Sequence, residues 1–290
     1  MTSGADLPEQ AAAPRVYAPA QGERAPAQGE RAPAQGERQP ALGARLLSVS
    51  GLSKSFGGVR AVDDVSFEVA AGELLALIGP NGAGKSTCFN MLNGQLASDA
   101  GEVRFEGRAI SGLKPRQVWR LGVGRTFQIT ATFSSMTVRE NVQVALLSHR
   151  RGLGNLLRRA HQQYVDEADA LLERVGMKAQ AERPCSVLAY GDLKRLELAV
   201  AMANRPRLLL MDEPTAGMAP KERIELMALA ADIVKSDHIG VLFTEHDMDV
   251  VFAHATRMIV LNRGQLIAQG APQEVRANPE VQRIYLGSRH

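Results

Sequence analysis

The sequence has few of the features that stabilise secreted or membrane-spanning proteins. Its 290 residues include two cysteines, Cys88 and Cys185, whose positions fit neither a metal site nor a disulfide framework and suit a reducing cytosol. The longest apolar runs, LLALIG at 74–79 and LLLM at 208–211, are far shorter than the roughly 18–20 residues that span a bilayer. The start, MTSGADLPEQ, has no basic segment followed by an apolar core, so no secretory signal is visible. We therefore expect any membrane association to go through a partner.

The excess of positive charge is also small. A net charge of +3 is too low to indicate nucleic acid as a partner, and we expect none. The composition, with 45% apolar and 22% charged residues, is that of a globular domain, and the length allows a large core with a subdomain.

Residues 1–45 differ from the rest of the chain. The heptapeptide APAQGER occurs three times in succession, at 18–24, 25–31 and 32–38. The segment is rich in Ala, Pro, Gly and charge and has almost no large apolar side chains, so burial cannot offset the entropy lost on ordering. We predict a disordered tail, although a partner-binding role is an alternative.

From residue 46 to residue 290 the pattern predicts one α/β domain. Strand and helix patterns alternate around a glycine-rich loop, which indicates a mainly parallel sheet, and two alternating segments before it indicate an antiparallel β subdomain. The stretch from about 114 to 190 is mainly helical and is interpreted as an inserted subdomain; Thr137 and Glu140 form a capping box within it. Short helices are expected over 272–286. The expected strands cover 46–56, 62–70, 74–79, 101–107, 207–214, 239–246 and 257–270.

Two further helices are predicted from the apolar spacing. One continues from the glycine-rich loop over 85–96, and the other runs from Pro220 to about Ser236. The second helix should bury a stripe formed by Ile224, Met227, Ala228, Ala231 and Val234.

The glycine-rich loop itself, GPNGAGKST at 79–87, has the spacing of a P-loop and lies between a buried strand and a helix. Glycines let successive backbone amides face a phosphate, Lys85 neutralises the β- and γ-phosphates, and the Ser86 hydroxyl can ligate Mg²⁺. The loop predicts binding of a nucleoside triphosphate. The phosphate site would consist of Gly79, Pro80, Asn81, Gly82, Ala83, Gly84, Lys85, Ser86 and Thr87.

The strand RLLLMDEP ends in two acids that complete this site. Asp212 lies at the carboxyl end of the strand, where it can hold Mg²⁺, and Glu213 can orient or deprotonate an attacking water.

With these motifs the chain resembles the ATP-binding cassette (ABC) ATPases over essentially all of residues 46–290. The resemblance implies a head-to-tail dimer that sandwiches ATP between the P-loop of one copy and the signature turn of the other. The sequence LAYGD occupies the signature position, so Ala189, Tyr190 and Gly191 would contact the partner's ATP at a helix N-terminus. Two residues depart from the family pattern here, because Ala189 stands in place of serine and Asp192 in place of glutamine.

Other family positions are carried over singly. Gln128 in GRTFQ matches the Q-loop glutamine that contacts Mg²⁺, His246 in TEHD matches the switch histidine at the γ-phosphate, and Phe56 matches the aromatic that stacks on adenine. The aspartate often found six residues after the catalytic glutamate is replaced by Ala219.

Several fragments are similar to the ATPase subunits of branched-chain amino-acid importers, above all GRTFQ, LAYG, EPTAGM and the ending EVRANPEVQRIYLG. This resemblance implies ATP-driven uptake of branched-chain or related amino acids or amides, with a second ATPase copy or a homologous subunit, membrane permeases and, indirectly, a periplasmic solute-binding protein. The chain would lie peripherally on the cytoplasmic face of a bacterial inner membrane. The inserted subdomain would receive the permeases. Its basic run at 149–161 could face lipid headgroups or a partner, or be solvated surface.

Three alternatives stay open at this point. They are the ATPase of a lipopolysaccharide-export system, a soluble ABC protein of translation or DNA repair, and a P-loop kinase or GTPase. The kinase or GTPase would leave LAYGD and TEHD without roles. The soluble proteins usually carry two cassettes or a long coiled coil, and only about 127 residues separate Lys85 from Asp212 here.

Overall fold

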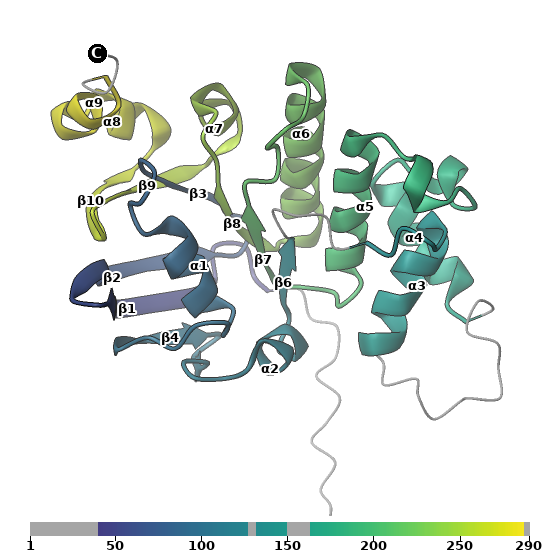
Figure 1. Cartoon of the computed structure of the whole chain (residues 1–290), viewed down its shortest axis with the longest axis horizontal. Coiled ribbons are helices and arrows are strands. Elements are labelled where there is room, and N and C mark those ends of the chain that lie inside the picture. The colour runs from purple at the N-terminus through teal and green to yellow at the C-terminus, as the bar shows by residue number, and fades with distance from the viewer. Residues whose placement is uncertain (1–39, 127–131, 150–162, 287–290) are drawn as a thin grey trace, which may run out of the picture. The chain divides into compact units, whose positions relative to one another are not determined.

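The protein is described by a computed structural model that covers residues 40–126, 132–149 and 163–286. Two sheets and the helices around them make up the predicted α/β domain (Figure 1). No helix in these three ranges combines the length and the apolar character needed to cross a membrane.

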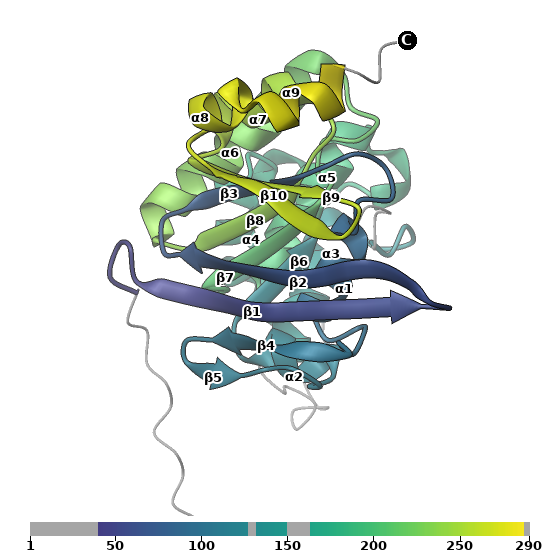
Figure 2. The ribbon, with the colours of Figure 1, turned by 90° about the vertical axis from the view of Figure 1, so that its left-hand side faces the viewer.

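The smaller sheet is antiparallel and has the strand order β2-β1-β4-β5 (Figure 2). Its strands are β1 (Arg45–Phe56), β2 (Val59–Ala70), β4 (Ala100–Phe105) and β5 (Arg108–Ala109). Alternate side chains of β2 are buried, among them Val65, Phe67 and Val69, because successive residues of a strand point to opposite faces. This sheet is the predicted β subdomain.

The larger sheet has the strand order β10-β9-β3-β8-β7-β6 and is parallel except for its β9–β10 hairpin. Its strands are β3 (Leu74–Ile78), β6 (Val123–Thr126), β7 (Leu208–Asp212), β8 (Gly240–Thr244), β9 (Arg257–Asn262) and β10 (Gln265–Gly270). The mainly parallel sheet predicted from the sequence is confirmed.

The central strands are buried on both faces, and successive residues enter two different hydrophobic cores. In β3, Leu75 and Leu77 join the core shared with the antiparallel sheet, whereas Ala76 and Ile78 join the core formed with the helices on the other face. This explains why these strands are continuous apolar runs rather than alternating patterns, since both faces need apolar side chains.

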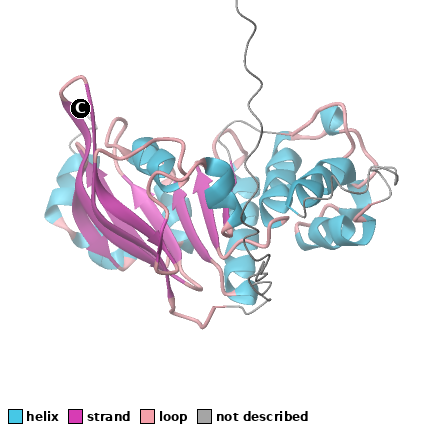
Figure 3. Ribbon diagram, turned by 90° about the horizontal axis from the view of Figure 1, so that it is seen from below, coloured by secondary structure: helices cyan, strands magenta, loops and turns pink. Residues whose placement is uncertain are grey.

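The helices gather mainly on one side of the parallel sheet, as the view from below shows (Figure 3). Helices α3, α4 and α5 pack on one another to form the helical subdomain, and α5 also packs on α6. The helices are α1 (Lys85–Leu92), α2 (Pro115–Arg120), α3 (Val138–His149), α4 (Val165–Arg174), α5 (Tyr190–Met202), α6 (Pro220–Asp237), α7 (Met248–His254), α8 (Pro272–Ala277) and α9 (Pro279–Leu286). The predicted capping box is present, because Thr137 N donates to Glu140 and Glu140 N donates to Thr137 Oγ1.

Three details differ from the prediction. Helix α1 ends at Leu92 rather than 96, because Gly94 adopts φ +77°, where a Cβ would lie 2.1 Å from Leu113 O. The stretch expected to be helical from about 114 contains β6, which pairs with β7 in the large sheet, so the helical subdomain begins only after β6.

The third difference is the face that α6 buries. Ile224 is 56% exposed, which makes its predicted core position wrong. The buried face is rotated from the predicted stripe by about 100°, one residue step around the helix. It consists of Leu226, Met227, Ala230, Ile233 and Val234.

Candidate functional site

The phosphate loop connects β3 to α1 and depends on two glycines. Gly84 adopts φ +104°, and a Cβ there would lie 2.2 Å from Ala61 O. At Gly79 a Cβ would lie 2.3 Å from Leu261 O. The loop is therefore packed so closely against β2 and β9 that side chains at these two positions would collide with backbone.

The register of the sheet brings the predicted acids to this loop. Thr244, the last residue of β8, pairs with Asp212 on one side and with Leu77 on the other. The carboxyl ends of β3, β7 and β8 are thus level, and the residues that follow them share one edge of the sheet. Ligands of open α/β sheets bind at such an edge.

Asp212 is a buried carboxylate held from two sides. Its Oδ1 accepts a hydrogen bond from Thr244 Oγ1 at 2.8 Å, and its Oδ2 lies 3.4 Å from Arg125 Nη2. The Asp212 side chain is 11% exposed, so these contacts fix the direction in which its remaining lone pairs point.

Glu213 adopts a left-handed backbone conformation with φ +48°, which is uncommon outside glycine. Its N–H donates to both the carbonyl and the hydroxyl of Thr244, and these bonds stabilise the unusual turn. The turn directs Glu213 Oε1 to within 2.8 Å of His246 Nε2. Two residues that the sequence predicts as catalytic are therefore in direct contact.

Lys85 supplies the positive charge of the site. Its Nζ donates to Gly79 O at 2.7 Å and to Pro80 O at 3.1 Å. Burial lowers the pKa of the Lys85 ammonium, and the nearby carboxylates of Glu213 and Asp212 oppose this shift. A buried ammonium whose hydrogen-bond partners among the described residues are carbonyl groups has a strong affinity for a phosphate anion.

The signature residues begin α5 in a different part of the domain. Ala189 is the N-cap of α5, and a Cβ on Gly217 would lie 3.4 Å from the Tyr190 ring, so this ring packs against the loop that follows Glu213. Figure 1 places α1 and α5 on opposite sides of β7. The helix that begins with the signature residues thus lies across β7 from the helix that follows the phosphate loop.

Phe56 and Gln128 are the remaining residues predicted for the site. Phe56 ends β1 and is 49% exposed; it lies in the hairpin whose second strand contacts the phosphate loop at Ala61, with Lys54 Nζ 5.7 Å from its ring centroid. Gln128 lies outside the residues that the structure describes.

Comparison with known proteins shows the family of the chain. Residues 62–216 match the family described as ABC transporter. The chain is 44% identical over 249 residues to the high-affinity branched-chain amino acid transport ATP-binding protein LivG of Salmonella typhimurium, a match that covers 83% of this chain and 98% of LivG. The chain belongs to the ABC transporter family.

Further similarities agree with this assignment. The ABC cassette is 41% identical over 251 residues to the high-affinity branched-chain amino acid transport ATP-binding protein BraF of Pseudomonas aeruginosa, covering 83% of this chain and 98% of BraF. A solved ATP-binding cassette of an ABC transporter in its ADP conformation superposes with a TM-score of 0.75 at 30% identity, covering 84% of this chain and 99% of that one. Residues 265–290 match the family described as branched-chain amino acid ATP-binding cassette transporter.

The predicted family and activity are thereby confirmed. The chain is an ATP-binding and ATP-hydrolysing subunit, and the comparisons support this prediction over a P-loop kinase or GTPase, a soluble ABC protein and a lipopolysaccharide exporter.

Two residues of the cassette that contact Asp212 were not predicted from the sequence. Thr244 could have been found as the polar last residue of a buried strand. Arg125 could have been found as a charged residue in a short strand just before Gln128.

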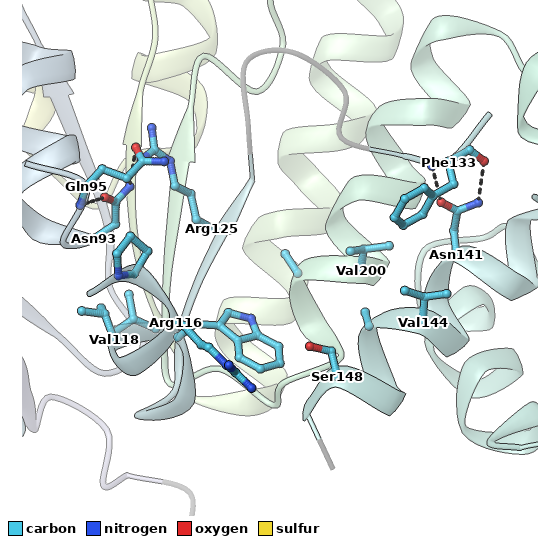
Figure 4. Close-up of a pocket in the computed structure, with 15 residues that line it drawn as sticks. Asn93, Gln95, Arg116, Val118, Arg125, Phe133, Asn141, Val144, Ser148 and Val200 are labelled. Carbon is cyan, nitrogen blue, oxygen red and sulfur yellow. Dashed lines mark hydrogen bonds between the residues drawn. The ribbon is translucent and has the colours of Figure 1, made fainter. Parts of the chain in front are cut away.

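A cavity of about 430 Å³ lies beside this site (Figure 4). Helix α2 and strand β6 line one side of it, and helices α3 and α5 of the helical subdomain line the other. Most of its lining is apolar, with Trp119, Phe133 and Val200 among the lining residues, and Asn93, Gln95 and Arg125 supply polar atoms at one end.

Proposed function

We propose that this cassette uses ATP and Mg²⁺ to drive uptake of branched-chain amino acids, or of related amino acids or amides, through membrane permease subunits. The observation that carries the solute class is the match of residues 265–290 to a family of branched-chain amino acid cassettes, together with the near full-length similarity to LivG and BraF. A periplasmic solute-binding protein would deliver the solute, and the cassette would lie on the cytoplasmic face of a bacterial inner membrane.

The side chains at the sheet edge suit Mg²⁺. Asp212 offers a fixed carboxylate, and Ser86 is an exposed residue in the first turn of α1, so the donors are the oxygens that this ion prefers. Gln128 would add an amide oxygen. When bound, the ion would neutralise charge on the β- and γ-phosphates.

The remaining residues would divide the work of hydrolysis. Lys85 would hold the β- and γ-phosphates, Glu213 would orient the attacking water and accept its proton, and His246 would hydrogen-bond the γ-phosphate. The 2.8 Å contact of His246 with Glu213 supports this division, because each residue restricts the other's orientation. Phe56 would stack on adenine.

A second copy of the chain, or a homologous subunit, would complete each nucleotide site. Ala189, Tyr190 and Gly191 open α5, whose amide end carries partial positive charge suited to a γ-phosphate. Helix α5 lies across β7 from the helix that follows the phosphate loop of the same chain, which supports contact with the partner's ATP. Closure on ATP and reopening after hydrolysis would move the helical subdomain.

The cavity beside α2, β6, α3 and α5 would receive a segment of each permease. Its apolar lining favours an amphipathic segment, and its position at the root of the helical subdomain suits the transmission of that movement.

The test of this function uses the complex that the tagged chain forms in membranes. We expect permease subunits to copurify, and vesicles containing the complex, its solute-binding protein and ATP to accumulate labelled leucine. The Lys85→Ala variant should lower leucine accumulation by at least about tenfold, because a charge-assisted contact contributes about 1.5–3 kcal/mol. The matched control is Lys221→Ala, which removes a lysine whose side chain is 89% exposed.

Two results would count against this proposal. One is the isolation of a complex without permeases. The other is a complex with permeases that accumulates none of leucine, isoleucine and valine.

A further inference from the structure

Arg125 is the residue that contacts both the candidate metal site and the wall of the cavity. It lies on β6 next to β7, and its guanidinium is largely buried, with 14% of the side chain exposed. Nη1 donates to Gln95 Oε1 at 2.7 Å and to Asn90 Oδ1 at 3.1 Å, and Nη2 lies 3.4 Å from Asp212 Oδ2. Burial lowers the pKa of Arg125 and Asp212 opposes this shift, but an arginine stays charged at neutral pH.

The three contacts are unequal. The two amide oxygens hold the guanidinium at normal hydrogen-bond distances, whereas the contact with Asp212 is at the outer limit. These two contacts hold the guanidinium on the α1 side, and of the three contacts the one with Asp212 changes at the lowest cost.

The anchored side is part of the cavity wall. Gln95 and Arg125 both line the cavity, and Figure 4 shows them beside Asn93 at one end of it. Asn93 Oδ1 accepts a hydrogen bond from Gln95 N at 2.9 Å, which fixes the Gln95 backbone. A chain of hydrogen bonds therefore runs from the cavity wall through Gln95 and Arg125 to Asp212.

We propose that Arg125 is a positioning residue that links metal binding at Asp212 to the state of the cavity. The inference rests on the proposed metal site and on the proposed docking of permeases in the cavity. The Arg125 guanidinium and a divalent ion would both contact the Asp212 carboxylate. A divalent ion bound to Asp212 therefore weakens the Arg125 contact, and the guanidinium then shifts toward Gln95. Linkage is reciprocal. If metal binding changes the affinity of the cavity for an occupant that moves Gln95, that occupant changes the affinity of the site for the metal by the same factor.

The single tryptophan of the chain reports on the cavity. Trp119 lies in α2, lines the cavity and meets the His149 ring edge-on at a centroid distance of 5.4 Å. Its emission therefore measures a change in the cavity wall without any transport assay.

The experiment compares ATP binding with and without metal in the full chain. Each protein carries Glu213→Gln, so that ATP is not turned over. Titration calorimetry gives the dissociation constant for ATP in EDTA and in MgCl₂. The constant in EDTA divided by the constant in MgCl₂ measures the contribution of the ion to ATP affinity. Trp119 emission is recorded in the same two conditions. The variants are Arg125→Gln, Arg125→Lys and the control Arg116→Gln, which removes the same charge from the cavity lining but leaves the Arg125–Asp212 pair intact.

Arg125→Gln should raise the ratio about threefold, because a cation that competes for Asp212 is lost, and should abolish the Mg²⁺-dependent change in Trp119 emission. Arg125→Lys, which keeps the charge, should fall between this variant and the parent. Arg116→Gln should match the parent in both measurements. A thermal melt verifies that each variant is folded.

The proposal is overturned if Arg125→Gln gives the same ratio as Arg116→Gln, or if its Trp119 response persists. Failure of every variant, Arg116→Gln included, to bind ATP would instead contradict the proposed function.

Discussion

The backbone of Glu213 carries a local cost that the fold maintains. A non-glycine residue in the left-handed region costs on the order of 1 kcal/mol, and two hydrogen bonds from its N–H to Thr244 offset this. The conformation turns the carboxylate toward His246 at the sheet edge. Strain of this kind concentrates where a side chain must point in one direction for its function.

Glu213→Gln should retain ATP binding and lower the hydrolysis rate by about 100-fold or more, because the amide cannot accept the proton of the attacking water. With ATP and Mg²⁺, size-exclusion chromatography of this variant should show a dimer that persists. A matched control is Glu222→Gln, an acid in the first turn of α6. A Glu213→Gln variant that turns over ATP at the parent rate would contradict the assigned role.

Most residues of the candidate site could be predicted from the sequence. Each motif places a residue of known chemical function next to a turn or a strand end that the local sequence indicates. Asp212 ends a buried strand, Lys85, Glu213 and His246 come after buried strands, and parallel strands end together. The contact between Arg125 and Asp212 could not be predicted, since the two residues are 87 positions apart and the contact depends on β6 lying beside β7.

At the scale of elements, patterns with strong periodicity or fixed turn chemistry were predicted well. Strands β3, β7 and β8, the capping box at Thr137 and the start of α6 at Pro220 were confirmed. The segment 257–270 forms the two strands β9 and β10 rather than one, and β6 lies in a stretch expected to be helical. The buried face of α6 was predicted wrongly, because its alanines fit two neighbouring stripes and packing against α5 and α7 selects one of them. The end of α1 depends on a positive φ at Gly94 that the apolar spacing does not report.

Helix α7 provides an element-scale prediction. Asp247 is its N-cap, accepting hydrogen bonds from the N–H groups of Asp249 and Val250, and it also pairs with Arg223 at 2.8 Å. Burial raises the pKa of Asp247, but the bonds from Arg223 and from the two backbone N–H groups outweigh this and leave the pKa below its ordinary value. Asp247→Ala should lower the free energy of unfolding at pH 7 by about 1–2 kcal/mol.

The pH dependence of this effect has a definite sign. Because the folded-state pKa is depressed, the charge of Asp247 stabilises fully above the unfolded-state pKa of about 3.9, and this contribution is lost as the pH falls through the folded-state pKa. Denaturant unfolding should therefore show the difference between parent and Asp247→Ala shrinking below about pH 4. Asp249→Ala is the control, and an unchanged difference down to pH 2 would contradict the account.

At the scale of the whole molecule, we propose that the cassette carries two halves of a nucleotide site. The phosphate loop leads into α1 and the signature turn begins α5, and these two helices lie on opposite sides of β7, the strand that ends in Asp212 (Figure 1). Contacts within one chain fix the conformation of each half. Neither half by itself surrounds a γ-phosphate, which is why a second copy enters the proposal.

The most direct test of this account is the ATPase rate per molecule of the purified chain, measured over a range of protein concentrations at saturating ATP and Mg²⁺. If two copies form the reactive site, the rate per molecule should rise with concentration at low protein and level off once dimers dominate. A rate per molecule that stays constant down to concentrations at which light scattering detects only monomers would contradict the account.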